Sequence, residues 1–151
     1  MLEIERKFLV KPNINFALIA EDSFQIRQAY LSAIPDSTVR VRISGEKAFL
    51  TVKSRNKGAV RNEWEYEIPF DEASQMMEIP GISKIEKIRY IVPFQGKKWE
   101  IDVFQGALSG LVLAEIELSS VDEVVEIPPF IDNEVTYDPK YYNSNLARNS
   151  V

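Results

Sequence analysis

Charged side chains at every second position are the feature of this 151-residue sequence that could do chemistry. They occur in five short runs and at two single positions: Glu3-x-Glu5-x-Lys7, Arg40-x-Arg42, Arg61-x-Glu63-x-Glu65, Lys87-x-Arg89, Glu115-x-Glu117, Lys53 and Asp102. Residues two apart in a strand lie on the same face, so these charges would line shared faces. Clustered Arg and Lys side chains favour an oligoanion such as polyphosphate, and clustered carboxylates favour divalent cations. A metal–polyphosphate complex is a ligand that needs both.

The absence of His and Cys restricts the chemistry further. It excludes a disulfide framework, a Cys/His zinc site and a Ser-His-Asp triad. A metal site must then use oxygen ligands, which favours Mg²⁺, Mn²⁺ or Ca²⁺. A general base must be a carboxylate, Lys, Tyr or a metal-bound water. The sequence therefore favours metal-assisted chemistry on an anionic ligand.

The net charge of −5 argues against non-specific nucleic-acid binding. Charged residues interrupt the N-terminal segment, and no apolar stretch is long enough to span a membrane. We therefore expect a cytoplasmic protein that binds neither nucleic acid nor membranes.

Alternation of apolar and charged residues predicts about eight strands. Their expected ranges are 2–10, 24–31, 38–44, 48–53, 61–68, 84–92, 98–104 and 111–118. Helices are expected at 71–78, 120–125 and 138–148, with one further turn within 13–20. The outward residues Trp64, Tyr66, Ile68, Trp99, Ile101 and Val103 are expected to pack under these helices.

Two arrangements fit this pattern. One is an antiparallel sheet with an ordinary solvated face, and the other is a closed barrel with its charges inward. The charged face is almost wholly Arg, Lys and Glu, which favours the barrel, and eight strands enclose room for one small ligand. Such a barrel cannot have a water-free interior. Burying each ion costs on the order of several kcal/mol, whereas the free energy of unfolding of a whole domain is only roughly 5–15 kcal/mol. We expect one α+β domain over residues 1–151, mainly antiparallel β: a closed eight-stranded tunnel barrel with a charged interior and a few covering helices, including a C-terminal one.

These motifs resemble those of the CYTH superfamily, the triphosphate tunnel metalloenzymes. The N-terminal Glu3-Ile4-Glu5-Arg6-Lys7 looks like the family's Glu-x-Glu-x-Lys signature, and the other charged blocks follow in the family's order. The tail, with Thr136-Tyr137-Asp138 and the segment 141–147, is similar to the end of small bacterial members. The family includes inorganic triphosphatases, thiamine triphosphatases, class IV adenylyl cyclases and fungal-type RNA triphosphatases.

The resemblance implies a role for each charged residue. Glu3, Glu5 and Glu117 would bind a first Mg²⁺ or Mn²⁺ ion. Glu63, Glu65, Asp102 and Glu115 would bind or orient a second ion and the attacking water. Lys7, Arg40, Arg42, Lys53, Lys87 and Arg89 would hold phosphoryl oxygens, and Lys87 is also counted among the catalytic residues. Arg61 would either bind substrate or pair with a Glu inside the barrel.

The resemblance favours a metal-dependent hydrolase that cleaves inorganic triphosphate to pyrophosphate and phosphate. The alternatives are a class IV-type adenylyl cyclase, a nucleoside or thiamine triphosphatase, and a non-catalytic polyphosphate-binding module. A homodimer is possible. The C-terminal helix is expected to plug one tunnel end, with Leu146 buried and Arg148 near the opening.

Overall fold

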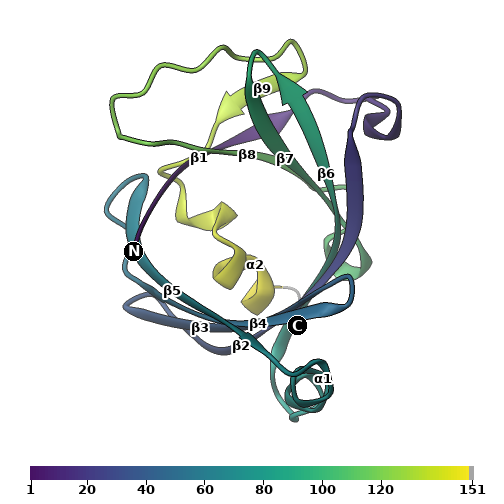
Figure 1. Cartoon of the computed structure of the whole chain (residues 1–151), viewed down its shortest axis with the longest axis vertical. Coiled ribbons are helices and arrows are strands. Elements are labelled where there is room, and N and C mark those ends of the chain that lie inside the picture. The colour runs from purple at the N-terminus through teal and green to yellow at the C-terminus, as the bar shows by residue number, and fades with distance from the viewer. Residues whose placement is uncertain (150–151) are drawn as a thin grey trace.

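The computed structural model describes residues 1–149, with side chains through residue 147, and is built mainly from antiparallel strands (Figure 1). The strands are β1 (Leu2–Val10), β2 (Asp22–Ile34), β3 (Ser37–Ser44), β4 (Lys47–Ser54), β5 (Val60–Ile68), β6 (Ser83–Phe94), β7 (Lys97–Phe104), β8 (Val112–Glu117) and β9 (Ile131–Glu134). The helical elements are α1 (Phe70–Met77), α2 (Asn143–Asn149) and the 3₁₀ turns η1 (Phe16–Leu18), η2 (Gly106–Leu108) and η3 (Pro139–Tyr141). No helix within residues 1–149 is both long and apolar enough to cross a membrane.

Eight of the strands close into a barrel. The hydrogen-bonded order is β5-β4-β3-β2-β6-β7-β8-β1, and β5 pairs back onto β1 to complete the ring. The first residues of β1 pair with β5 (Glu3 opposite Arg61), and its later residues extend past β5 and pair with the short strand β9. This confirms the predicted closed eight-stranded α+β barrel, to which β9 adds one strand.

The outer face of the barrel is covered in two places. Around Trp99 and Ile101, both fully buried, the segment that carries η1 and the segment that leads to Phe130 pack over β1, β6, β7 and β8. Helix α1 places Ala73 and Met77 against the outward residues of β2, β3 and β4. Alternation along the strands therefore turns the opposite side chains toward the tunnel.

The C-terminal helix lies inside the ring of strands rather than outside it (Figure 1). Leu146 and Ala147 are buried against inward apolar side chains of the barrel, among them Tyr30, Ile85 and Leu113. The prediction that this helix plugs one tunnel end with Leu146 buried is confirmed. The expected position of Arg148 falls outside the described side chains.

Two expectations about covering helices are wrong. Trp64 and Tyr66 remain 45% and 60% exposed, because no helix in the described chain crosses the outer face of β4 and β5 at their level. Only Ile68, near the end of β5, packs against the α1 cluster. The segment 120–125 forms a single turn, in which the Glu123 amide donates to the Ser120 carbonyl at 3.2 Å. Val121 and Val124 are exposed and only Val125 packs against the outer cluster, so the segment has too little buried apolar surface to stabilise a short helix.

The C-terminal helix also begins later than its sequence suggests. Asp138 caps η3 by accepting a hydrogen bond from the Lys140 amide, and the extended backbone of Tyr142 (ψ 133°) then interrupts the helix. Helix α2 starts at Asn143. The predicted helix over 138–148 is therefore a 3₁₀ turn followed by a separate helix.

Candidate functional site

The charged residues predicted from the sequence lie on the tunnel side of the barrel wall. Val41 and Ile43 pack in the outer cluster under α1, so Arg40 and Arg42 face the interior. Ile116 packs outward in the same way, which turns the flanking Glu115 and Glu117 inward. The same alternation holds on the other strands and places the predicted site residues on the inner side of the barrel wall, where Glu65 and Glu117 remain exposed to solvent.

Direct cross-strand neighbours form much of the electrostatic network. Four ion pairs join residues in register: Lys7–Glu115 at 3.4 Å, Arg61–Glu3 at 3.2 Å, Lys53–Glu63 at 3.3 Å and Arg89–Asp102 at 2.7 Å. Four more reach a diagonal or second partner: Lys53–Glu3 at 3.0 Å, Lys87–Asp102 at 2.7 Å, Arg89–Glu100 at 2.8 Å and Arg40–Glu65 at 3.6 Å. Arg61 thus forms the pair with a Glu inside the barrel that was one of its two expected roles, and its role in substrate binding stays a prediction.

The tunnel has a basic wall and an acidic wall. Arg40 and Arg42 stand on β3, whereas Glu115 and Glu117 stand on β8. These strands are four places apart in the ring of eight, so they lie on opposite sides of the tunnel (Figure 1). A ligand that spans the tunnel therefore has arginines on one side and carboxylates on the other.

Arg42 is bound to a neutral side chain rather than to a carboxylate. Its Nε and Nη2 donate to Oε1 of Gln28 at 3.0 and 2.9 Å. Burial and the nearby positive charges of Arg40 and Arg89 lower the pKa of Arg42 to about 10, so it remains charged near neutral pH. Its positive charge is thus only weakly compensated, which suits an anionic ligand.

Lys87 and Asp102 form the most deeply buried pair of the site, with Nζ 2.7 Å from Oδ2 and both side chains almost fully buried. Asp102 also accepts two hydrogen bonds from Arg89, at 2.7 and 2.9 Å. Burial alone would raise the pKa of Asp102, but the charges of Arg89 and Lys87 outweigh it and lower the pKa to about 2. Burial lowers the pKa of Lys87 to about 7, and Arg89 and Arg42 add to this while Asp102 opposes it.

The acidic wall brings like charges together. Glu5 lies directly opposite Glu117, and Glu100 directly opposite Glu115, and such like-charge neighbours destabilise a sheet. Burial and the negative charges of Glu115 and Glu3 raise the pKa of Glu5 to about 8. This wall therefore carries more negative charge than its own lysines and arginines compensate.

A second group of carboxylates surrounds Lys53 on the neighbouring strands. Burial and a hydrogen bond shared with Glu3 raise the pKa of Glu63 to about 7. Burial would also raise the pKa of Glu3, but the hydrogen bond with Glu63 and the charges of Lys53 and Arg61 outweigh it and hold the pKa of Glu3 well below its usual value. Glu63 is therefore a carboxyl that gains and loses a proton near neutral pH.

The donors on these walls are carboxylate oxygens, as hard divalent cations require. Oε1 of Glu115 is buried and has Nζ of Lys7, at 3.4 Å, as its ion-pair partner. Burial and the negative charges of Glu115 and Glu3 raise the pKa of Glu5, and a bound cation would favour its charged form. Within residues 1–149, no group of three or more carboxylates is already gathered around a common point. The residue types and charges therefore fit a divalent cation, and rotation of these side chains would be needed to surround it.

Three further side chains of the tunnel wall were missed by the sequence analysis. Gln28 is fully buried and holds Arg42, and the Thr51 hydroxyl donates to Glu65 at 2.7 Å. Both side chains are neutral, so the pattern of alternating charges does not identify them as site residues. Glu100 was also missed, although it lies two residues before Asp102 and the alternation already present in β7 could have identified it.

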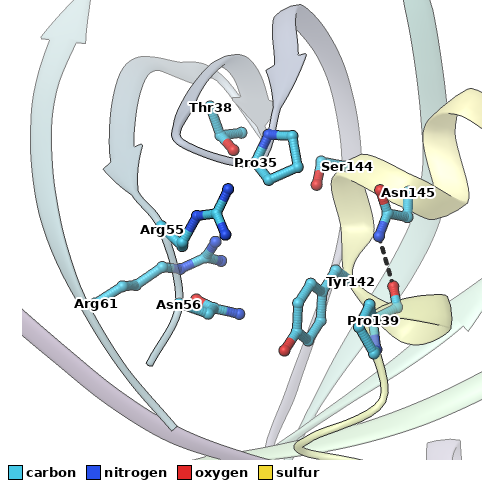
Figure 2. Close-up of a pocket in the computed structure, with 9 residues that line it drawn as sticks. All are labelled: Pro35, Thr38, Arg55, Asn56, Arg61, Pro139, Tyr142, Ser144 and Asn145. Carbon is cyan, nitrogen blue, oxygen red and sulfur yellow. Dashed lines mark hydrogen bonds between the residues drawn. The ribbon is translucent and has the colours of Figure 1, made fainter. Parts of the chain in front are cut away.

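The two ends of the tunnel differ. At the end away from α2, a cavity of about 580 Å³ is lined by residues that include Glu21, Asp22, Lys98, Glu100 and Glu117. Beside α2, a cavity of about 300 Å³ is lined largely by the β2–β3 turn, the β4–β5 loop and the C-terminal segment (Figure 2). Residues Glu100 and Glu117 of the acidic wall therefore reach the larger of these two cavities.

Known proteins with this arrangement were found by sequence and by structure. The CYTH domain model matches residues 1–142. An inorganic triphosphatase of Acetivibrio thermocellus is 44% identical over 148 residues, covering 97% of this chain and 94% of the relative. An inorganic triphosphatase of Nitrosomonas europaea is 38% identical over 151 residues, with 97% of each chain covered.

A solved crystal structure of an inorganic triphosphatase superposes with a TM-score of 0.68 at 34% identity, covering 96% of this chain and 93% of that one. The shared fold thus extends over nearly the whole of both chains. With the charged tunnel in place and the family model matched over most of its length, the chain belongs to the CYTH family.

Proposed function

We propose that this chain hydrolyses inorganic triphosphate to pyrophosphate and phosphate in a metal-dependent reaction inside the tunnel. The observation that carries the proposal is the pairing of an arginine wall on β3 with a carboxylate wall on β8, across one enclosed space. Two relatives at 44% and 38% identity are named inorganic triphosphatases, which supports the same reaction here.

The basic wall would bind the substrate. Arg42, aimed by Gln28 and flanked by Arg40 and Arg89, has donors for phosphoryl oxygens and little competing negative charge. Lys7, Lys53 and Lys87 would balance further negative charge of the triphosphate, each from a buried position in the wall. Phosphoryl transfer depends mainly on such positioning and charge stabilisation, which requires no covalent intermediate with the protein.

The carboxylates would hold the cations and the attacking water. Glu3, Glu5 and Glu117 are proposed for a first Mg²⁺ or Mn²⁺ ion, because Glu5 and Glu117 are direct neighbours across β1 and β8. We propose that Asp102 on β7 and Glu115 on β8, together with Glu63 and Glu65 on β5, hold a second ion and the water. When bound, such cations polarise phosphoryl oxygens and lower the pKa of a coordinated water.

Hydrolysis then requires one proton acceptor and one leaving group. The water oxygen forms a bond to the terminal phosphorus, and the bond from that phosphorus to the bridging oxygen breaks, releasing pyrophosphate. Glu63, with its pKa of about 7, is suited to accept the proton of the water. Lys87 and Arg89, close to Asp102, would stabilise negative charge that develops on the phosphate oxygens.

The test is a substrate panel with the purified full-length chain and Mg²⁺ or Mn²⁺. Triphosphate, ATP and thiamine triphosphate are supplied separately, and phosphate, pyrophosphate and cyclic AMP are measured. Fastest release of phosphate and pyrophosphate from triphosphate, lost in excess EDTA and restored by metal, is the expected result. Cyclic AMP as the main product, turnover unaffected by EDTA, or binding without turnover would contradict the proposal. Cytoplasmic localisation and homodimer formation stay predictions.

A further inference from the structure

The cavity of about 300 Å³ beside α2 is lined by two arginines and several smaller polar side chains (Figure 2). Arg55 and Asn56 come from the β4–β5 loop, Arg61 from β5, and Tyr142 and Ser144 from the C-terminal segment. None of its described lining residues is a carboxylate. The lining is therefore rich in hydrogen-bond donors and carries positive charge.

Both arginines are held by a carboxylate at Nε only. Nε of Arg61 donates to Oε1 of Glu3 at 3.2 Å, and Nε of Arg55 donates to Oδ1 of Asp36. Among the described residues, no hydrogen bond is made by the terminal nitrogens of either guanidinium group, and both groups extend into the cavity (Figure 2). Each guanidinium group therefore has one carboxylate partner, and its terminal nitrogens remain as donors for a further anion in the cavity.

The loop that carries Arg55 is fixed against the C-terminal segment. Gly58 adopts a φ of 64° and lies so close to Tyr137 that an added Cβ would come within 2.8 Å of the ring. Only glycine accommodates both the backbone conformation and this contact. This contact places the β4–β5 loop beside the C-terminal segment.

The cavity borders the proposed active site but is separate from it. A smaller space of about 20 Å³, lined by residues that include Glu3, Glu5 and Lys7, shares Asn56, Arg61 and Tyr142 with it. This neck has room for about one water molecule. An anion in the cavity would thus contact Arg61, which also pairs with Glu3 of the tunnel.

We infer that this cavity is a second binding site, for a phosphate oxyanion held between Arg55 and Arg61. Planar guanidinium groups bind the oxygens of phosphate through paired hydrogen bonds, and a tetrahedral phosphate is small enough for this space. The presence of an oxyanion site rests on the two arginines. Its assignment to inorganic phosphate rests on the proposed function, because that reaction releases phosphate, which would then bind to this cavity from solution.

The test is a titration of the full-length chain with inorganic phosphate, followed by the backbone amide signals of Asn56 and Ser144 in ¹H–¹⁵N NMR spectra. These signals are expected to shift and saturate in the wild type. In Arg55→Gln the dissociation constant read from them should rise about tenfold, since a charge-assisted contact is lost. Arg27→Gln, a matched change at an exposed residue of β2, should leave it unchanged.

The inference would be overturned if phosphate shifts the amide signals of tunnel residues but leaves those of Asn56 and Ser144 unchanged. Equal dissociation constants for Arg55→Gln and the wild type would also overturn it. The spectrum itself shows whether each variant is folded. Because the titration needs no turnover, a failure of the proposed triphosphatase activity would leave its outcome intact, and the two conclusions are tested separately.

Discussion

Arg42 and Gln28 face each other across β3 and β2, and two nitrogens of the arginine donate to the same oxygen of the amide, at 3.0 and 2.9 Å. The Gln28 amide nitrogen in turn donates to the Tyr30 hydroxyl at 3.2 Å. The amide therefore fixes the direction of the guanidinium group without neutralising its charge.

Replacing Gln28 should weaken triphosphate binding. Gln28→Glu would place a carboxylate against Arg42, and Gln28→Met would remove the acceptor while keeping the volume. Loss of a hydrogen bond to a charged group costs about 1.5–3 kcal/mol, so we expect the KM for triphosphate to rise at least about tenfold in both variants. Steady-state kinetics at saturating metal measure this. Wild-type KM values in both variants would show that Gln28 does not position Arg42.

Most of the barrel could be predicted because charge alternation is a local signal. Every second residue of a strand lies on its inward face, as in Val39-Arg40-Val41-Arg42, and the almost wholly charged character of this face on every strand favours a closed barrel over an open sheet. The short strand β9 was not predicted, because Ile131–Glu134 has one buried apolar residue and forms a strand only where β1 extends past β5.

The parts of the site that were missed depend on which strands lie side by side. Gln28 acquires its role from Arg42 on the neighbouring strand, and nothing in its own segment marks it. The exposed positions of Trp64 and Tyr66 likewise depend on how little of the outer surface α1 covers. Sequence periodicity fixes the face of a residue, whereas its neighbours are set by tertiary packing.

Asp102→Asn should destabilise the fold. The variant would leave Lys87 and Arg89 buried with their main counter-charge removed. Breaking a buried ion pair from one side costs about 3–5 kcal/mol, and we expect a loss of this size in the free energy of unfolding, measured with urea. Asp132→Asn, at an exposed position of β9, is the matched control and should change little. Equal losses in the two variants would argue against a structural role for the Asp102 network.

Leu146→Ala should loosen the helix inside the barrel. Leu146 is buried among inward side chains that include Tyr30, Ile85 and Leu113. A buried Leu→Ala change costs about 2–5 kcal/mol, and we expect a lower melting temperature together with faster amide hydrogen exchange in α2. Leu18→Ala, at a residue 81% exposed, serves as the control. Unchanged exchange in α2 would mean that Leu146 does not hold the helix in place.

Glu134→Gln should change stability in a pH-dependent way. Arg6 donates to both carboxylate oxygens of Glu134, at 2.9 and 2.8 Å, and its hydrogen bond lowers the pKa of Glu134 below the usual 4.5. The contribution of the pair is therefore complete above pH 4.5 and is lost as the pH falls through the lower folded-state pKa.

For such a partly exposed pair we expect about 0.5–1 kcal/mol at pH 7. The difference in melting temperature between the wild type and Glu134→Gln should shrink as the pH falls below about 4. Glu46→Gln, in the exposed β3–β4 turn, should show no such trend. A difference that stays constant from pH 7 to pH 4 and below would exclude ionisation of Glu134 as its cause.

The position of β1 between β5, β8 and β9 affects how the chain can fold as it is made. β1 is made before the other strands of the barrel, but its longest pairing is with β8, which ends at Glu117. At about 5–20 residues per second, this strand waits on the order of ten seconds for that partner. Its alternating Glu3, Glu5 and Lys7 are the kind of charge that keeps an unpaired strand from joining another chain. The residues proposed to bind metal and phosphate would thus also guard the nascent protein against aggregation.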